Sequence, residues 1–400
     1  MRDYLELLRI PGVKPLLFVS TFGRFAYSMV SLAIFFQVLS VTGSVGSAGL
    51  AVGLSAGLGA LTAGPRGHLV DRFGQTRPLF GFVPAYAASC LLLATLGQGA
   101  AVAIVLSGLI GLTAPPLNIS IRPLWLDIVG QERVRLAYSV DTAYASLVML
   151  LGPVVATLIA LHLSPRVAIG AVGVSMLLGG LLLAFNRHSQ AWVPEAKEHG
   201  EDGILRSPAM RLLALEGAAM GLSIGFVTIG IPAVATLSGE QQLTGPIMSA
   251  MGVGAIIGTI WAGAKAKRIA PANGLRAATF LFAIALLPLP FVPVGPWMML
   301  VVLVAWAFIG PANVFYLETI DVVRPRGTAV AALGSLWMIE GAAGALGNAL
   351  GGNVAVWIGP HATLALGSLF VLFSPLIFTV GIRGVLRPAS KEEFTQVNTG

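Results

Sequence analysis

Apolar runs of about 20 residues recur along this chain from one end to the other, and they limit what it can fold into. The first reads PLLFVSTFGRFAYSMVSLAIFFQVLS, residues 15–40, and Arg24 is its only charged residue. Such a run can cross a hydrocarbon core of ~30 Å as a helix, which satisfies its own backbone polar groups. Charged residues make up only 10% of the 400 residues, whereas soluble proteins carry about 25%. The sequence therefore predicts a polytopic, all-α membrane protein.

The apolar runs and the polar segments between them predict about twelve transmembrane helices, with both termini in the cytoplasm. Their approximate limits are 14–40, 47–66, 78–97, 100–121, 135–162, 166–186, 208–237, 244–264, 275–293, 297–318, 328–357 and 361–382.

The basic residues agree with this topology. Of the 24 Lys and Arg residues, 22 fall in the predicted cytoplasmic segments, Arg166 falls outside, and Arg24 lies within a span. Bacterial inner-membrane proteins show this bias of positive charge toward the cytoplasm. The net charge of +7 is thus explained by topology and by attraction to an anionic leaflet, and it does not indicate nucleic-acid binding.

The polar segment 187–207 divides the predicted spans into two sets of six. We expect an N-terminal six-helix domain over 1–186, a cytoplasmic linker over 187–207, and a C-terminal six-helix domain with a short tail over 208–400. The halves resemble each other, since LRIPGVKPLL (8–17) matches LRSPAMRLLA (205–214) at an offset of 197 residues. Parallel repeats of this kind are found in secondary transporters, whose substrate site lies near the membrane midplane.

The loop after the second predicted span reads GHLVDRFGQTRPL, residues 67–79. It resembles the cytoplasmic loop of the major facilitator superfamily, roughly G-x-L-A-D-R-x-G-R-R-x-x-L. The residues kept are Gly67, Leu69, Asp71, Arg72 and Gly74. The departures are Val70, Gln75 and Thr76, and they remove some of the loop's usual positive charge.

The resemblance extends over all twelve spans and implies two six-helix domains that alternate between inward-open and outward-open states. It also implies that the loop is a cytoplasmic latch. Asp71 would face the positive N-terminal end of span eleven, near Gly327, and favour the outward-open state. The alternative is an ordinary basic loop with no gating role.

Two further positions bear on the type of transporter. Gly152-Pro153 in span five resembles the end of a longer glycine-rich motif of exporters, and either a kink used in rocking or a packing kink explains it. In span four, Ser107 stands where many proton-coupled exporters of the superfamily carry an arginine. The segments RIPGVKPLL, GRFAYSM and TGSVGSAGL, with the later Gly-Pro span, resemble a broad group of bacterial facilitator-type permeases of the drug- or metabolite-efflux-like type. Members of that group often carry a Gly-Arg pair in span one, as Gly23-Arg24 does here.

Small residues recur every fourth position at Gly49, Gly53 and Gly57. This spacing predicts a face for close helix packing. The string GLSAG within it matches the nucleophile elbow of hydrolases, but it lies inside a span without a preceding strand.

Glu318 and Asp321 lie near the cytoplasmic end of span ten, and four ionisable residues lie deeper inside predicted spans: Arg24, Asp141, Glu216 and Glu340. Each would cost at least ~2.5–3.5 kcal/mol at the membrane centre, so each should pair, face the interior or line water. One hypothesis is that Arg24 pairs with Glu216 or Glu340, or binds an anionic substrate, while a carboxylate carries protons. The alternative is a fixed salt bridge that orients helices.

By resemblance, spans one, four, seven and ten line a central cavity. The candidate residues for substrate binding or coupling are Arg24, Tyr27, Asn118, Glu216, Asn313, Tyr316, Trp337 and Glu340.

These features together predict a secondary transporter of the bacterial inner membrane that exports a small organic molecule, coupled to protons. An importer or passive facilitator of a small, possibly anionic metabolite is the first alternative. A membrane enzyme or lipid scramblase is the second, and we expect no enzyme activity. The single cysteine, Cys90, excludes an internal disulfide. We expect no cofactor and no metal, and a monomer whose partners are lipid, substrate and protons.

Overall fold

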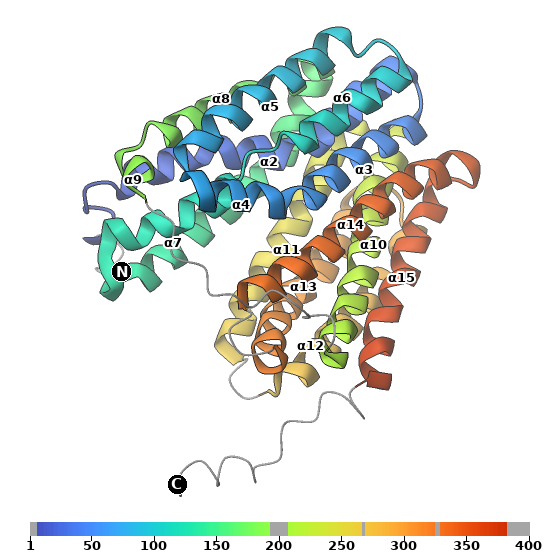
Figure 1. Cartoon of the computed structure of the whole chain (residues 1–400). Coiled ribbons are helices and arrows are strands. Elements are labelled where there is room, and N and C mark those ends of the chain that lie inside the picture. Colours follow the sequence, from blue (N-terminus) through green and yellow to red (C-terminus); the bar gives the residue numbers. More distant parts are fainter. Residues whose placement is uncertain (1–5, 193–206, 266–268, 325–328, 382–400) are drawn as a thin grey trace, which may run out of the picture.

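The computed structural model describes residues 6–192, 207–265, 269–324 and 329–381, and these form helices joined by short connections. Two helical bundles follow one another along the chain (Figure 1). The first contains α2 (Val13–Thr42), α3 (Val45–Leu61), α4 (Ala63–Phe73), α5 (Thr76–Leu96), α6 (Ala100–Leu112), α7 (Leu117–His162) and α8 (Pro165–Ala184), followed by the short α9 (Arg187–Ala191). The second contains α10 (Pro208–Leu237), η2 (Gln241–Leu243), α11 (Thr244–Lys265), α12 (Pro271–Leu286), η4 (Leu289–Phe291), α13 (Pro296–Val323), α14 (Ala329–Trp357) and α15 (Pro360–Gly381).

Nine helices of the described chain are long and apolar enough to cross a membrane, and ten if α3 and α4 count as one bent span. Two predicted spans are not among them. Helix α6 has only 13 residues, and the sequence of α14 contains many glycines together with the polar residues Glu340 and Asn348. The multi-pass, all-α architecture is confirmed, whereas the number twelve is not.

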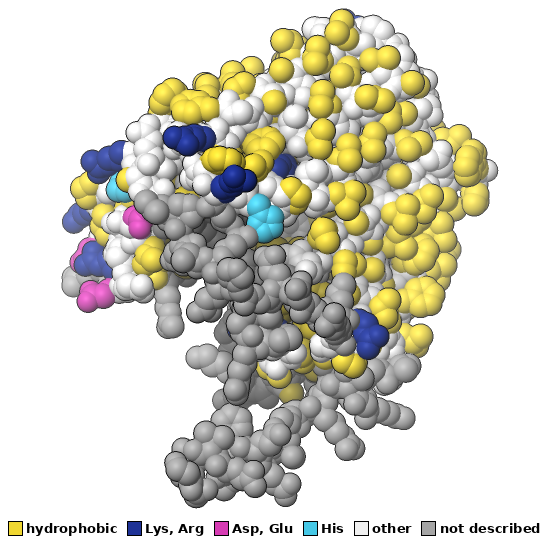
Figure 2. All heavy atoms as spheres, viewed as in Figure 1, with side chains coloured by type: hydrophobic (Ala, Val, Ile, Leu, Met, Phe, Trp, Pro, Cys, Tyr) yellow, Lys and Arg dark blue, Asp and Glu magenta, His cyan; other side chains and the backbone are white. Residues whose placement is uncertain are grey.

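The outer surface fits a lipid environment. Large apolar side chains are exposed on most of the long helices, among them Phe18, Leu91, Val105, Ile260 and Phe373. On the face drawn in Figure 2, apolar side chains cover wide areas, while charged ones gather mainly near one end of the first bundle. This distribution is the one expected for helices whose sides contact lipid and whose ends contact water.

Predicted span four, 100–121, is wrong as a single helix. Helix α6 ends at Leu112 and α7 begins at Leu117, so the chain is not helical at Pro115-Pro116. Proline lacks an N–H donor and disfavours helical geometry in the residue before it, which accounts for the break. A second break inside α7 lies at Gly130, whose φ of 73° suits glycine.

The carbonyl groups freed by the first break find donors in neighbouring helices. The Arg66 guanidinium donates to the Ala114 carbonyl, and the Tyr27 hydroxyl donates to the Pro115 carbonyl. Arg66 also donates to the Thr62 carbonyl at 3.1 Å and is 8% exposed. Irregular backbone at membrane depth needs such partners, so Arg66 and Tyr27 stabilise the broken span.

The two bundles contact each other through glycines on α3 and α14. A Cβ atom on Gly49 would lie 2.7 Å from the Gly352 Cα, and one on Gly53 would lie 2.7 Å from the Ala345 carbonyl oxygen. Only glycine permits this approach of two backbones, so the predicted packing role of the G-x-x-x-G face is confirmed.

A second contact joins α7 to α11. The Ser249 hydroxyl of α11 donates to the Leu150 carbonyl of α7 at 2.6 Å, and Gly245 lies against the backbone of Pro153. Together with the α3–α14 contact, it joins the ends of the bundles that lie away from the linker.

The linker-side ends of the bundles diverge, so that the pair forms a V (Figure 1). The divergence begins where α4 bends from α3 by 42°. At this point Gly341 of α14 is close to Ala60 of α3, since a Cβ on Gly341 would lie 3.1 Å from the Ala60 Cβ. The helices of the two bundles therefore diverge on the side of α9 and the start of α10 (Figure 1).

We expect a Gly53→Leu substitution to separate α3 from α14, because the new side chain would overlap Ala345 and Ala349. Labelling of an Asn353→Cys reporter by a membrane-impermeant maleimide should rise several-fold. Asn353 is half-buried beside Gly46, and the native Cys90 is buried. Gly64→Leu is the matched control, since a Cβ there meets nothing within 4 Å. Equal labelling in both variants would show that this contact does not close the bundles.

Candidate functional site

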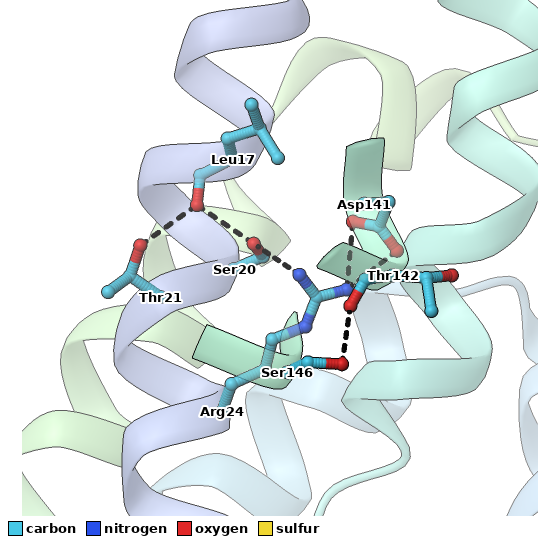
Figure 3. Close-up of polar contacts among 7 residues, drawn as sticks. All are labelled: Leu17, Ser20, Thr21, Arg24, Asp141, Thr142 and Ser146. Atoms are coloured by element: carbon cyan, nitrogen blue, oxygen red, sulfur yellow. Dashed lines mark hydrogen bonds and ion pairs between the residues drawn. The ribbon is translucent and has the colours of Figure 1, made fainter. Parts of the chain in front are cut away.

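Arg24 of α2 forms an ion pair with Asp141 of α7 inside the first bundle (Figure 3). Its Nη2 atom donates to both carboxylate oxygens of Asp141 at 2.8 Å. Its Nη1 atom donates to the Ser20 hydroxyl at 3.2 Å, one helical turn away on the same face of α2. Both charged residues are only 7% exposed, so the pair is desolvated and held in fixed geometry.

The hypothesis that Arg24 pairs with Glu216 or Glu340 is therefore wrong. Those glutamates belong to the second bundle, while Asp141 lies in the same bundle as Arg24. Because Asp141 neutralises the guanidinium, Arg24 offers no free positive charge to an anionic substrate. The alternative, a salt bridge that orients helices, agrees with the structure.

The contact between α2 and α7 continues on both sides of the ion pair. The hydroxyls of Thr21 and Tyr144 are 2.6 Å apart. Farther along, Gly152 packs so closely on Ser28 that a Cβ atom at Gly152 would lie 1.9 Å from the Ser28 hydroxyl oxygen. Gly152 thus serves packing, and the non-helical backbone within α7 lies at Gly130 rather than at Pro153.

The second bundle holds two carboxylates near each other. Glu216 of α10 is 3% exposed and accepts a hydrogen bond from the Ser374 hydroxyl of α15 at 3.0 Å. Glu340 of α14 lies within electrostatic reach of Glu216. Tyr316 of α13 is close to both carboxylates, and its hydroxyl donates to the Leu213 carbonyl at 3.4 Å.

A cavity of about 560 Å³ adjoins this pair between α10, α13 and α14. Its walls include Ile224, Asn313, Tyr316, Trp337 and Glu340. Four of the eight candidate residues thus line one cavity, and a fifth, Glu216, is buried beside it.

Close packing of α10 on α14 brings these groups together. A Cβ atom on Gly221 would lie 2.1 Å from the Glu340 carbonyl oxygen. One on Gly217 would lie 3.1 Å from the Tyr316 hydroxyl and 3.7 Å from the Glu340 Cβ. The absence of side chains at Gly217 and Gly221 leaves room for Tyr316 and Glu340 beside α10.

The remaining candidates lie elsewhere. Arg24 and Tyr27 belong to the first bundle. The Tyr27 hydroxyl donates a hydrogen bond to the Pro115 carbonyl at the break before α7. The side chains of Asn118 and Asp71 fall outside the described part of the structure. Arg66, which ends the predicted span 47–66, is not among the candidate residues singled out from the sequence. The proline pair could have indicated a broken span, but no sequence pattern shows which side chain bonds its carbonyls.

The predicted latch is only partly described. Gly67 and Arg72 lie in α4, and Gly74 ends that helix with a φ of 77°. A Cβ atom on Gly67 would meet nothing within 4 Å. The start of span eleven near Gly327 lies outside the described residues, so the contact of Asp71 with it stays a prediction.

Metal binding has no obvious ligand set in the described residues, which contain no group of three or more His, Cys, Asp or Glu side chains suited to an ion.

We expect Arg24→Gln and Asp141→Asn each to destabilise the protein by about 3–5 kcal/mol, because each leaves one buried charge without its partner. The double variant should lose less than the sum of the two. Thermal unfolding of the purified protein in one detergent measures all three. Additive losses would show that the two residues do not act as a pair.

Comparison with known proteins gives the family. The sequence matches the family model described as Major Facilitator Superfamily over residues 16–347. Among curated proteins, no relative matches the sequence.

Solved transporters share the fold at low sequence identity. Nucleoside transporter NupG is 14% identical with a TM-score of 0.72, over 92% of this chain and 98% of that chain. Peptide transporter POT in complex with sulfate is 18% identical with a TM-score of 0.72, over 95% and 96% of the two chains. A bacterial homologue of the iron transporter ferroportin, in an inward-facing state, is 15% identical with a TM-score of 0.73, over 94% and 98%. With its family model covering most of the sequence, the chain belongs to the major facilitator superfamily.

Proposed function

We propose that this protein is a secondary active transporter that exports a small organic molecule across the bacterial inner membrane by alternating access, coupled to protons. The family and the transporter fold support the general class and point away from an enzyme. The direction, the coupling ion and the membrane are part of the proposal.

The observation that carries the proposal is the cavity beside Glu216 and Glu340. Glu340 lies about 17 Å along α14 from the start of that helix, which is deep within the predicted span 328–357. Ionisable residues at such depth are expensive to keep, and they commonly mark substrate or proton pathways. A carboxylate there can take up a proton while the cavity faces one side and release it toward the other.

The shape of the molecule supports alternating access. The bundles meet away from the linker and diverge toward it, which corresponds to one of the two states of a rocking transporter. If the linker is cytoplasmic, as the basic residues indicate, this is the inward-open state. Substrate would then enter from the cytoplasm, and closure around α4 and the start of α14 would precede release outside.

An importer or passive facilitator is the main alternative. The argument that Arg24 would attract an anionic substrate is weakened, because Asp141 already neutralises that residue. A test needs a substrate, and binding partners can be found by the thermal stabilisation that they give to the purified protein. Transport of such a molecule is then measured in proteoliposomes with and without a protonophore. Transport that persists unchanged would contradict proton coupling.

We expect Glu216→Gln and Glu340→Gln to differ in their effect on the pH dependence of transport. The variant that removes the proton carrier should flatten the pH profile, while the other should change the rate and keep the profile. Rates across a pH series in proteoliposomes measure this. Glu240→Gln, in the exposed connection between α10 and η2, is the control with the same change in charge. Two variants that both keep the wild-type profile would place the coupling group elsewhere.

We expect Asp71→Asn to reduce turnover without reducing membrane insertion. The carboxylate would no longer interact with the N-terminal end of α14, so the outward-open state would lose stabilisation. Transport rate normalised to the amount of inserted protein is the measurement. Wild-type kinetics in this variant would show that α4 has no gating role.

A further inference from the structure

The cavity of the second bundle combines a carboxylate with polar groups that have no partner among the residues that the structure describes. Glu340 lines it and, within the described part of the chain, forms neither an ion pair nor a hydrogen bond. Asn313 and the half-exposed Trp337 also line it. Polar groups inside a membrane protein are normally satisfied by protein or by water, so these groups are available to a ligand.

The buried guanidinium groups in the described part of the structure are used elsewhere. The guanidinium of Arg24 is paired with Asp141, and that of Arg66 bonds carbonyl groups at the break before α7. Glu216 has the Ser374 hydroxyl as its hydrogen-bond donor, and its charged neighbour is another carboxylate. When both glutamates are ionised, the site therefore has a charge that a bound cation would balance.

Resting on the function proposed above, we infer that the transported molecule is an organic cation, with its positive group held by Glu340 and an apolar body between Trp337 and Ile224. The carboxylate supplies the charge that selects a cation over a neutral or anionic molecule. The oxygens of Asn313 and Tyr316 accept hydrogen bonds where the cation is an amine.

Size and composition of the cavity agree with this ligand class. A volume of about 560 Å³ falls within the range of roughly 300–1,000 Å³ typical of small-molecule sites. Trp337 and Tyr316 place two aromatic rings on its walls. Aromatic faces attract quaternary ammonium and other cations through their quadrupole, so the same walls suit both the apolar body and its charge.

The test is direct binding to the purified full chain in lipid nanodiscs, measured by equilibrium dialysis. The probe is radiolabelled benzyltriethylammonium, whose charge does not depend on pH. The comparison probes are N,N-diethylbenzamide, which is neutral, and benzenesulfonate, which is an anion. We expect saturable binding of the cation that is at least tenfold tighter than that of either comparison probe.

Variants assign the binding to the cavity. Glu340→Gln should weaken cation binding at least tenfold, and Trp337→Ala should weaken it several-fold. Glu340→Asp keeps the charge and should retain much of the affinity, which separates loss of charge from loss of folding. Glu240→Gln should bind as the wild type does. The inference is overturned if the cation does not bind, if it binds no better than the other probes, or if Glu340→Gln leaves its affinity unchanged.

The binding test and the transport test can each give a negative result independently of the other. A protein that binds the cation through Glu340 but does not move it across proteoliposomes contradicts the proposed transport function and leaves the cation site standing. A protein that transports only neutral or anionic molecules contradicts the cation site and leaves the transport function standing.

Discussion

A charge inside the hydrocarbon core has to be paired, hydrogen-bonded or wetted, because an isolated one is too costly to keep. This constraint shapes both bundles. In the first, Arg24 meets Asp141 at 2.8 Å and the two charges cancel. Arg66 instead bonds the carbonyl groups of a broken helix. In the second bundle the constraint is only partly met, since Glu340 lines a cavity without a partner among the described residues. A carboxylate without a partner can be neutralised by a bound cation or by a proton.

The internal repeat makes this contrast between the bundles clearer. Helices α2 and α7 pack together in the first bundle as α10 and α14 do in the second. Asp141 and Glu340 lie on the matching helices α7 and α14, 199 residues apart (340 − 141) against a repeat offset of 197. Arg24, which neutralises Asp141, has no equivalent in the second bundle, because the repeat places Gly221 at the corresponding position. The helices α2 and α7 are therefore held together by an ion pair in the first bundle, whereas the matching helices α10 and α14 line a cavity in the second.

Composition and span length were enough to predict the fold class, because the membrane allows few backbone solutions. The glycine spacing on α3 also predicted a packing face, since a period of four places small residues on one side of a helix. The partner of Arg24 could not be found in this way. Spacing along one helix does not show which helix lies opposite, and Asp141 is 117 residues away in the chain. The break at Pro115-Pro116 was missed because the apolar run continues through it, although the proline pair indicated it.

Helix α14 connects the site to the proposed movement. From Gly341 onward it packs on α3 through small residues, and at Gly341 it parts from α3 as α4 bends away. Glu340, the residue just before this point, lines the cavity. A change in the angle between the bundles would therefore move α3 and α4 relative to Gly341, the residue next to Glu340. A cation bound there, or a proton carried there, would in turn favour the angle at which that carboxylate is best satisfied.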